Sequence, residues 1–164
     1  MLDSLFKKVL VAYNGSKSSL SAVLYAIIMA KLYGCSVKVI YVVDSASIKQ
    51  LSIAKVMVAD EADEISRTLT EDGKKNLEYV KELASQKKIE VETELLKGAV
   101  WSEIVRAADV WKADIVLLGG VNDNSTSYSV HENVSRQDSE IIGSAHCSVL
   151  VVRDKYISQK FRLL

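Results

Sequence analysis

The segment KVLVAYNGS, residues 8–16, sets the pattern that the rest of the chain repeats. Its first part, Lys8–Tyr13, is almost wholly apolar, which is typical of a strand buried on both faces of a parallel sheet. The Asn-Gly-Ser sequence that follows, residues 14–16, favours a turn and also caps helices. Apolar residues then recur at helical spacing up to Gly34, which is typical of a helix end. The segment therefore predicts a strand, a turn and a helix.

Three further apolar runs and one segment of alternating charged and apolar residues follow this unit, with helical periodicity in most of the intervals between them. We expect strands at Ser36–Val43, Glu90–Leu96, Ile115–Leu118 and Ser148–Val152. A long crossover helix is expected from Glu61 to Lys88, with Gly73 tolerated inside it. Because strand and helix alternate to a fifth strand, the sequence predicts the α/β class. The expected architecture is a single-domain, open five-stranded parallel sheet, Rossmann-like, with helices on both faces.

Three segments have less regular patterns. The stretch Asp44–Asp60 is interpreted as irregular or partly helical, and the sequence assigns it no role. Trp101 and Trp111 fall on the apolar face of the third helix, so we interpret both as core residues rather than a stacking platform. The end of the chain is mixed in character and is expected to be mobile or to contact a partner subunit. We therefore divide the chain into a domain, residues 1–153, and a C-terminal tail, residues 154–164.

The composition excludes several classes of function. With 164 residues, 49% of them hydrophobic, the chain can fill one core and has no room for a second domain. Its 21 basic and 21 acidic residues give a formal net charge of zero, so no overall field attracts nucleic acid or an anionic membrane. No apolar stretch approaches the roughly 20 residues that span a bilayer, and the start of the chain lacks a signal-peptide pattern. We expect a cytoplasmic protein that binds neither nucleic acid nor membrane.

No catalytic or metal-binding constellation is recognisable in the sequence. Cys35 and Cys147 are too far apart, with too few histidines between them, for a short zinc motif, so we interpret both as buried, reduced thiols. His146 beside Cys147 adds only one more group, which makes a poor ligand set for a metal. A nucleophile with a nearby base, paired carboxylates and a metal triad are all lacking at recognisable spacing. The sequence therefore favours a protein that is not an enzyme and holds no metal.

Five segments together resemble the universal stress protein family. They are KKVLVAYNGS (Lys7–Ser16), IYVVD (Ile40–Asp44), Gly98 with Glu103-Ile104-Val105, ADIVLLGG (Ala113–Gly120) and CSVLVV (Cys147–Val152). They occur in the order typical of the family and span nearly the whole chain. The resemblance implies an adenine nucleotide alpha hydrolase-like fold. It also implies a homodimer formed through the last strand, Ser148–Val152, with regulatory proteins as further partners.

Many members of this family bind ATP through glycines after the fourth strand, in the pattern G-x2-G-x9-G-[S/T]. Such glycines let backbone amides approach phosphate oxygens. If Gly119 is the first glycine, Asn122 stands at the second and Glu132 at the third. Counting back from the last strand instead places Ser135 and Arg136 at the glycine–hydroxyl pair. Neither register restores the motif, so the chain resembles the subgroup in which this motif is degenerate.

The resemblance still places a candidate nucleotide pocket, for ATP or AMP, at the carboxyl ends of the strands. Its residues are Ala12, Tyr13, Asn14, Val42, Leu118, Gly119, Asn122, Ser135 and Arg136. Asn14 stands where the family usually has aspartate, and it also fits a turn and cap position. Gly119 and Gly120 either approach a ligand closely or end the strand. Arg136 either meets a phosphate or lies on the surface.

Two functions from different classes remain open. The first is a stress-response or regulatory module that acts by dimerisation and protein contacts, without tight ATP binding or another cofactor. The alternative is a stress sensor that binds ATP or AMP through a modified loop between Gly119 and Ser135. An ATP-hydrolysing or adenylate-transferring enzyme is the least favoured interpretation, because no phosphate loop with lysine and no metal-binding carboxylate pair is recognisable.

Overall fold

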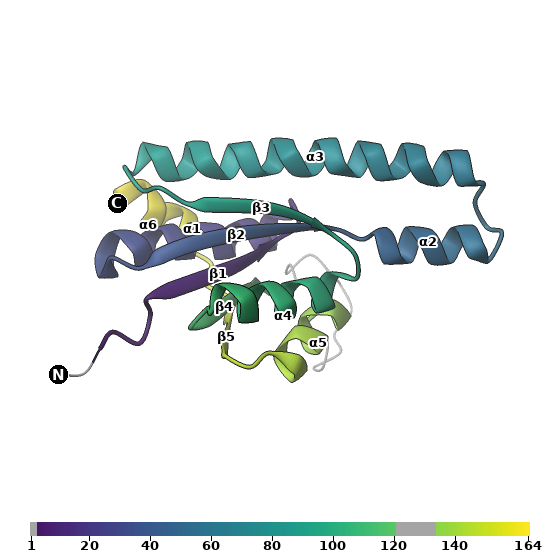
Figure 1. The fold of residues 1–164 in the computed structure, drawn as a ribbon. Coiled ribbons are helices and arrows are strands. Elements are labelled where there is room, and N and C mark those ends of the chain that lie inside the picture. Colours follow the sequence, from purple (N-terminus) through teal and green to yellow (C-terminus); the bar gives the residue numbers. More distant parts are fainter. Residues whose placement is uncertain (1–2, 121–133) are drawn as a thin grey trace.

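The computed structural model describes residues 3–120 and 134–164. They form a sheet of five parallel strands in the order β3-β2-β1-β4-β5 (Figure 1). The strands are β1 (Lys8–Tyr13), β2 (Ser36–Val43), β3 (Glu92–Lys97), β4 (Ile115–Gly119) and β5 (Ser148–Val152). The predicted α/β class and parallel sheet are confirmed, and β3 lies at an edge of the sheet.

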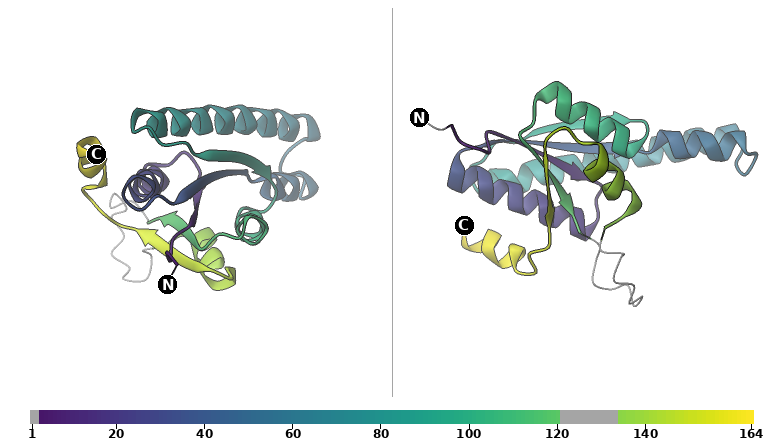
Figure 2. Two further views of the ribbon diagram at one scale, coloured as in Figure 1. Left: turned by 60° about the vertical axis from the view of Figure 1, so that its left-hand side comes forward. Right: turned by 90° about the horizontal axis from the view of Figure 1, so that it is seen from below.

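Helices cover both faces of this sheet (Figure 2). The first face carries α1 (Lys17–Tyr33), α3 (Ala59–Gln86) and α6 (Ile157–Leu163), and the second face carries α4 (Val100–Trp111) and α5 (Arg136–Ser144). Val9 and Val11 of β1 pack into the first core, whereas Leu10 packs into the second. Because side chains alternate across a strand, one apolar run fills both cores. Within the described residues, none of these helices has both the length and the apolarity needed to cross a bilayer.

Local signals fix both ends of α1. Ser16 caps its start, because the Ser16 Oγ accepts a hydrogen bond from the Ser19 N–H at 3.2 Å. Gly34 ends the helix with a φ of 70°, and its N–H donates to the Ala30 carbonyl at 2.9 Å. This left-handed conformation favours glycine, since other residues are strained there. The helix start and stop predicted from the sequence are confirmed.

The segment without an assigned role contains a further helix, α2 (Ser45–Ile53), which leads into α3. Asp44 caps α2 by accepting a hydrogen bond from the Ser47 N–H at 3.1 Å. Together, α2 and the first turns of α3 project beyond the carboxyl edge of the sheet (Figure 1). Apolar side chains exposed on this projection include Leu51, Ile53, Val56 and Val58.

Two expectations from the sequence are wrong. The C-terminal segment is not mobile but forms α6, because Ile157 and Phe161 lie one helical turn apart and are both buried in the first core. The alternative expectation, contact with a partner subunit, stays a prediction. Trp101, expected in the core, is 36% exposed in the first turn of α4. Trp111, at the other end of the same helix, is half-buried against the second core.

Candidate functional site

The predicted pocket lies at the carboxyl edge of the sheet, where the strand order changes direction. From β1 the chain extends the sheet through β2 on one side and through β4 on the other. Ligands of doubly wound folds bind at such a switch point. The structure brings predicted residues together here from the ends of three neighbouring strands: Ala12, Asn14, Val42, Leu118 and Gly119.

The predicted side chains divide between the two faces of the sheet. Ala12, Val42 and Leu118 belong to the second face, where they pack in the core beneath α4 and α5. Tyr13 faces the other way, and its hydroxyl donates to the Asn76 Oδ1 of α3 at 3.2 Å. Burial raises the pKa of the Tyr13 phenol, and two neighbouring tyrosines add to this effect, so it remains a proton donor. A ligand on the second face would meet only the main chain of Tyr13.

Asn14 is held as a turn residue at the start of α1. Its Oδ1 accepts hydrogen bonds from the Ser16 N–H at 3.0 Å and from the Ser19 hydroxyl at 2.7 Å. Its own N–H lies 3.3 Å from the Ser19 Oγ and donates to it. In the described part of the chain the side-chain amide nitrogen of Asn14 makes no hydrogen bond. This nitrogen is the part of the side chain that is left for a ligand.

Gly119 makes a close approach, but to the protein's own backbone. A Cβ at this position would lie 2.3 Å from the carbonyl carbon and oxygen of Ser18 in α1. The neighbouring Gly120 differs, since the nearest atom to a Cβ there would be 3.4 Å away in the flexible Arg153 side chain. Gly119 is therefore required by the packing of β4 against the first turn of α1, whatever its role towards a ligand.

The predicted phosphate-binding residues Ser135 and Arg136 lie at the start of α5, whereas Asn122 lies outside the described residues. Ser135 is the N-cap, and its Oγ accepts a hydrogen bond from the Asp138 N–H at 3.1 Å. Burial raises the pKa of the Asp138 carboxyl, although hydrogen bonds from Ser135 oppose the shift. Arg136 is exposed. The anion-attracting start of α5 is thus occupied by the chain's own side-chain oxygens.

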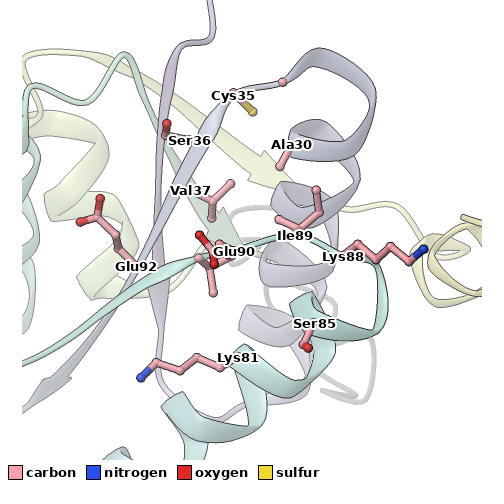
Figure 3. Close-up of a pocket in the computed structure, with 12 residues that line it drawn as sticks. Ala30, Cys35, Ser36, Val37, Lys81, Ser85, Lys88, Ile89, Glu90 and Glu92 are labelled. Atoms are coloured by element: carbon pink, nitrogen blue, oxygen red, sulfur yellow. The ribbon is translucent and has the colours of Figure 1, made fainter.

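A cleft of about 1000 Å³ lies at the opposite, amino edge of the sheet, between the C-terminal ends of α1 and α3 (Figure 3). Its floor includes the buried residues Ala30, Cys35 and Val37, and charged side chains such as Lys88 and Glu90 lie along its rim. Burial raises the pKa of the Cys35 thiol, which keeps it protonated and weakly nucleophilic. Cys35 is a free, buried thiol, as predicted.

The other cysteine lies beside a surface contact between a histidine and an acid. The His146 Nδ1 is 3.0 Å from the Asp109 Oδ2 of α4, and both side chains are exposed. Cys147 is half-buried, and burial together with the nearby Asp109 raises the pKa of its thiol. Among residues 3–120 and 134–164, no three His, Cys, Asp or Glu side chains are grouped so that they could hold a metal ion.

Sequence reasoning missed the contribution of α3 to the carboxyl edge. A Cβ at Gly73 would lie 2.8 Å from the ring of Tyr41 in β2 and from the side chain of Leu95 in β3. Gly73 is therefore required for α3 to approach the sheet, not merely tolerated within the helix. The glycine inside an otherwise strong helical pattern was the one feature of the sequence that could have indicated this close packing of α3 on the sheet.

Comparison with known proteins agrees with this geometry. The sequence profile of the Universal stress protein family matches residues 5–153. The universal stress protein MJ0531 of Methanocaldococcus jannaschii is 32% identical over 151 residues, which cover 92% of this chain and 84% of that protein. These matches extend well beyond half of the chain.

Solved structures share the fold at lower sequence identity. The structure of the hypothetical protein MJ0577 has a TM-score of 0.74 at 22% identity and covers 93% of this chain and 99% of that chain. A universal stress protein in complex with cAMP covers 92% of this chain and 98% of that chain, with a TM-score of 0.55 at 20% identity. The universal stress protein from Archaeoglobus fulgidus in complex with dAMP covers 92% of this chain and 100% of that chain, with a TM-score of 0.61 at 16% identity. At such identities the likeness shows the fold.

Proposed function

Because the chain belongs to the universal stress protein family, we propose that it is a stress-response or regulatory module that acts by pairing with itself and contacting other proteins, without tight ATP binding. The observation that carries this proposal is the occupied start of α5, where Ser135 and Asp138 take the place of a phosphate. The helix dipole and free N–H groups of a helix start are what a phosphate needs.

A triphosphate at the start of α5 would meet two obstacles. It would compete with the Ser135 Oγ for the Asp138 N–H, and it would lie beside the acidic side chain of Asp138. Like charges in a partly buried place repel strongly. Gly119 offers no compensation, because the space beside its Cα is filled by the Ser18 backbone.

Calorimetry on protein that has been unfolded, stripped of small molecules and refolded tests this proposal. We expect no saturable heat when ATP is added at submillimolar concentration. Circular dichroism before and after stripping shows whether the fold has been recovered. Micromolar ATP affinity in the refolded protein would overturn the proposal, and ATP turnover would restore the enzyme interpretation.

A second candidate function is an adenine mononucleotide sensor. The unused amide nitrogen of Asn14 and the half-buried Ala12 at the end of β1 favour it, because a base needs an apolar contact and few hydrogen bonds. Structural neighbours in complex with cAMP and dAMP supply the ligand class. Titration with AMP and cAMP separates the candidates, since only a sensor would saturate. Its affinity should fall in Asn14→Ala, which removes the amide donor.

The proposed homodimer forms through β5, at the edge of the sheet. The Gly120 N–H donates to the Val152 carbonyl at 3.2 Å, so the main chain of Val152 faces β4. In a parallel strand, the main-chain N–H and C=O groups of successive residues point alternately to the two sides of the strand. The N–H and C=O groups of Val149 and Val151 therefore point towards the free edge of β5. Such groups are a template for pairing with a second edge strand.

A further inference from the structure

A cavity of about 390 Å³ lies on the first face of the sheet, opposite the face on which Val42 is packed. It forms where the turn after β1, the strand β2 and the helix α3 meet. Its lining residues are Asn14, Gly15, Tyr41, Asp72, Lys75, Asn76 and Tyr79. This volume is at the lower end of the roughly 300–1000 Å³ typical of small-molecule sites.

Tyr41 presents a fixed hydroxyl to this cavity. The residue is only 9% exposed, and its ring packs against Gly73 and edge-on against Tyr13, with 6.2 Å between ring centroids. Its hydroxyl makes no hydrogen bond with the described residues, yet no fully buried side-chain polar atom among them lacks a partner. The hydroxyl must therefore reach the open space of the cavity. Burial and the nearby Asp72 raise the pKa of Tyr41, so the group is a proton donor.

The two charged residues of the cavity wall are left without ion pairs. On the same helix, Lys74 pairs with Glu71 at 3.4 Å and Lys81 pairs with Glu78 at 3.2 Å. Within the described residues, neither Asp72 nor Lys75 forms such a pair, with each other or with another residue. Both charges of the cavity wall are thus available to a ligand.

The amides of the wall have different roles. The Asn76 Oδ1 accepts from the Tyr13 hydroxyl and its Nδ2 donates to the Asp72 carbonyl, so the oxygen and one of the two amide hydrogens are committed. The oxygen of Asn14 is committed to the start of α1, but its amide nitrogen is available. The cavity therefore offers one ammonium, one carboxylate, amide donors and the phenols of Tyr41 and Tyr79.

We propose that this cavity binds a small zwitterion of the amino-acid class. The ligand carboxylate meets Lys75 and the Asn14 amide, the ligand ammonium meets Asp72, and the Tyr41 hydroxyl donates to a ligand oxygen. Tyr79, which is 45% exposed at the rim, covers the side chain of the ligand. A zwitterion satisfies both unpaired charges at once, whereas a simple anion or cation would leave one of them facing a like charge or no partner. Asp72, Lys75 and Tyr41 belong to this cavity alone, and the Asn14 amide nitrogen is the one group that it shares with the nucleotide sensor considered above.

Nuclear magnetic resonance titration of the full chain tests the proposal. The probes are glycine, L-serine, L-glutamine and L-phenylalanine, each at millimolar concentration. Binding should shift the amide resonances of Gly15, Tyr41 and Asn76 in a saturable manner. N-acetyl-L-phenylalanine lacks the ammonium group and L-phenylalanine amide lacks the carboxylate, so both should bind at least about tenfold more weakly than phenylalanine.

Variants of α3 provide matched controls. Asp72→Asn and Lys75→Gln should each weaken binding at least about tenfold, because each leaves one ligand charge unpaired. Lys74→Gln removes a neighbouring ammonium that pairs with Glu71 outside the cavity, and binding should be unchanged. All three positions are exposed, so the fold is expected to persist. A flat response to the whole panel, equal binding of the singly charged analogues, or equal loss in Lys74→Gln would each overturn the proposal.

Discussion

Gly119 at the end of β4 lies so close to Ser18 of α1 that a Cβ on the glycine would come within 2.3 Å of the Ser18 carbonyl oxygen. This contact joins the two sides of the switch point, since α1 follows β1 and β4 is the next strand in the sheet. A backbone cannot yield locally as the end of a flexible side chain can. The contact therefore fixes the turn after β1 relative to β4.

Substitution of Gly119 by alanine should destabilise the fold by about 1–3 kcal/mol, because the new methyl group must push two backbones apart. Urea unfolding followed by circular dichroism measures the change. Gly120→Ala is the matched control, since its Cβ would meet only the Arg153 side chain, at 3.4 Å. Equal midpoints for the two variants would contradict the packing explanation of Gly119.

Gly73→Ala should also destabilise the protein, by about 1–3 kcal/mol, because its Cβ would lie 2.8 Å from the side chains of Tyr41 and Leu95. Gly143→Ala in α5 is the control, since nothing lies within 4 Å of a Cβ there. Alanine is the better helix former, so this second change should be neutral or stabilise by up to ~1 kcal/mol. Thermal unfolding of the two variants distinguishes them by opposite shifts in Tm.

Asp114 anchors the start of β1 to the start of β4. Its Oδ2 accepts hydrogen bonds from the N–H groups of Lys7 at 2.9 Å and Lys8 at 2.8 Å. Asp114→Ala should cost about 1–3 kcal/mol, since hydrogen bonds to a charged acceptor are lost. Asp109→Ala removes only the exposed contact with His146 and should cost at most ~1 kcal/mol. Chemical denaturation of both variants checks this order, and a larger cost for Asp109→Ala would refute it.

Val151→Pro should convert the proposed dimer to a monomer. The substitution removes the N–H that faces the free edge of β5 and leaves the bonds of Val152 to β4 in place. Val151→Ala keeps the N–H and should remain dimeric. Multi-angle light scattering measures the mass, and Val151→Lys provides a second disruptive variant if proline perturbs the strand. A dimer that persists in folded Val151→Pro and Val151→Lys would place the interface elsewhere.

Asp138 should give the stability a measurable pH dependence. Burial raises the pKa of its carboxyl above the ordinary value of 3.8, so the folded state binds this proton more tightly than the unfolded state. The contribution of Asp138 to the free energy of unfolding is then lost as the pH rises from the ordinary pKa of the unfolded state through the raised pKa of the folded state. Asp138→Asn abolishes the titration, so the stability of this variant relative to the wild type should increase as the pH rises above the ordinary pKa of 3.8. Urea midpoints across that range measure the effect, and Glu140→Gln on the same helix is the control.

The succession of strands along the chain and most of their limits could be predicted because the signals are local. Lys8–Tyr13, Ser36–Val43 and Ser148–Val152 are strands with the predicted bounds, since each is a short apolar run bounded by polar or turn-forming residues. The C-terminal helix α6 was harder to predict, because a short segment with two apolar residues gives a weak helical pattern. Ile157 and Phe161 are stabilised as part of a helix only by packing into the core that contains α1.

The candidate site could be predicted only in part. Residues at the ends of β1, β2 and β4 share an edge because parallel strands align their carboxyl ends, so Ala12, Val42 and Leu118 were expected together. That Tyr13 belongs to the opposite face was implicit in the alternation of side chains. The residues that contact Gly119 and Gly73 could not be predicted from the sequence. A glycine can indicate close packing, but it does not identify the element that packs against it.

The sequence by itself determined the α/β class, the five strands and the family, since periodicity, turn residues and the order of segments are written along the chain. Only the tertiary structure decided that Gly119 meets Ser18 and that Tyr41 shares a cavity with α3. The physical reason is that these contacts join residues distant in sequence and depend on how helices pack on the sheet. Packing selects such contacts by shape, which local patterns do not encode.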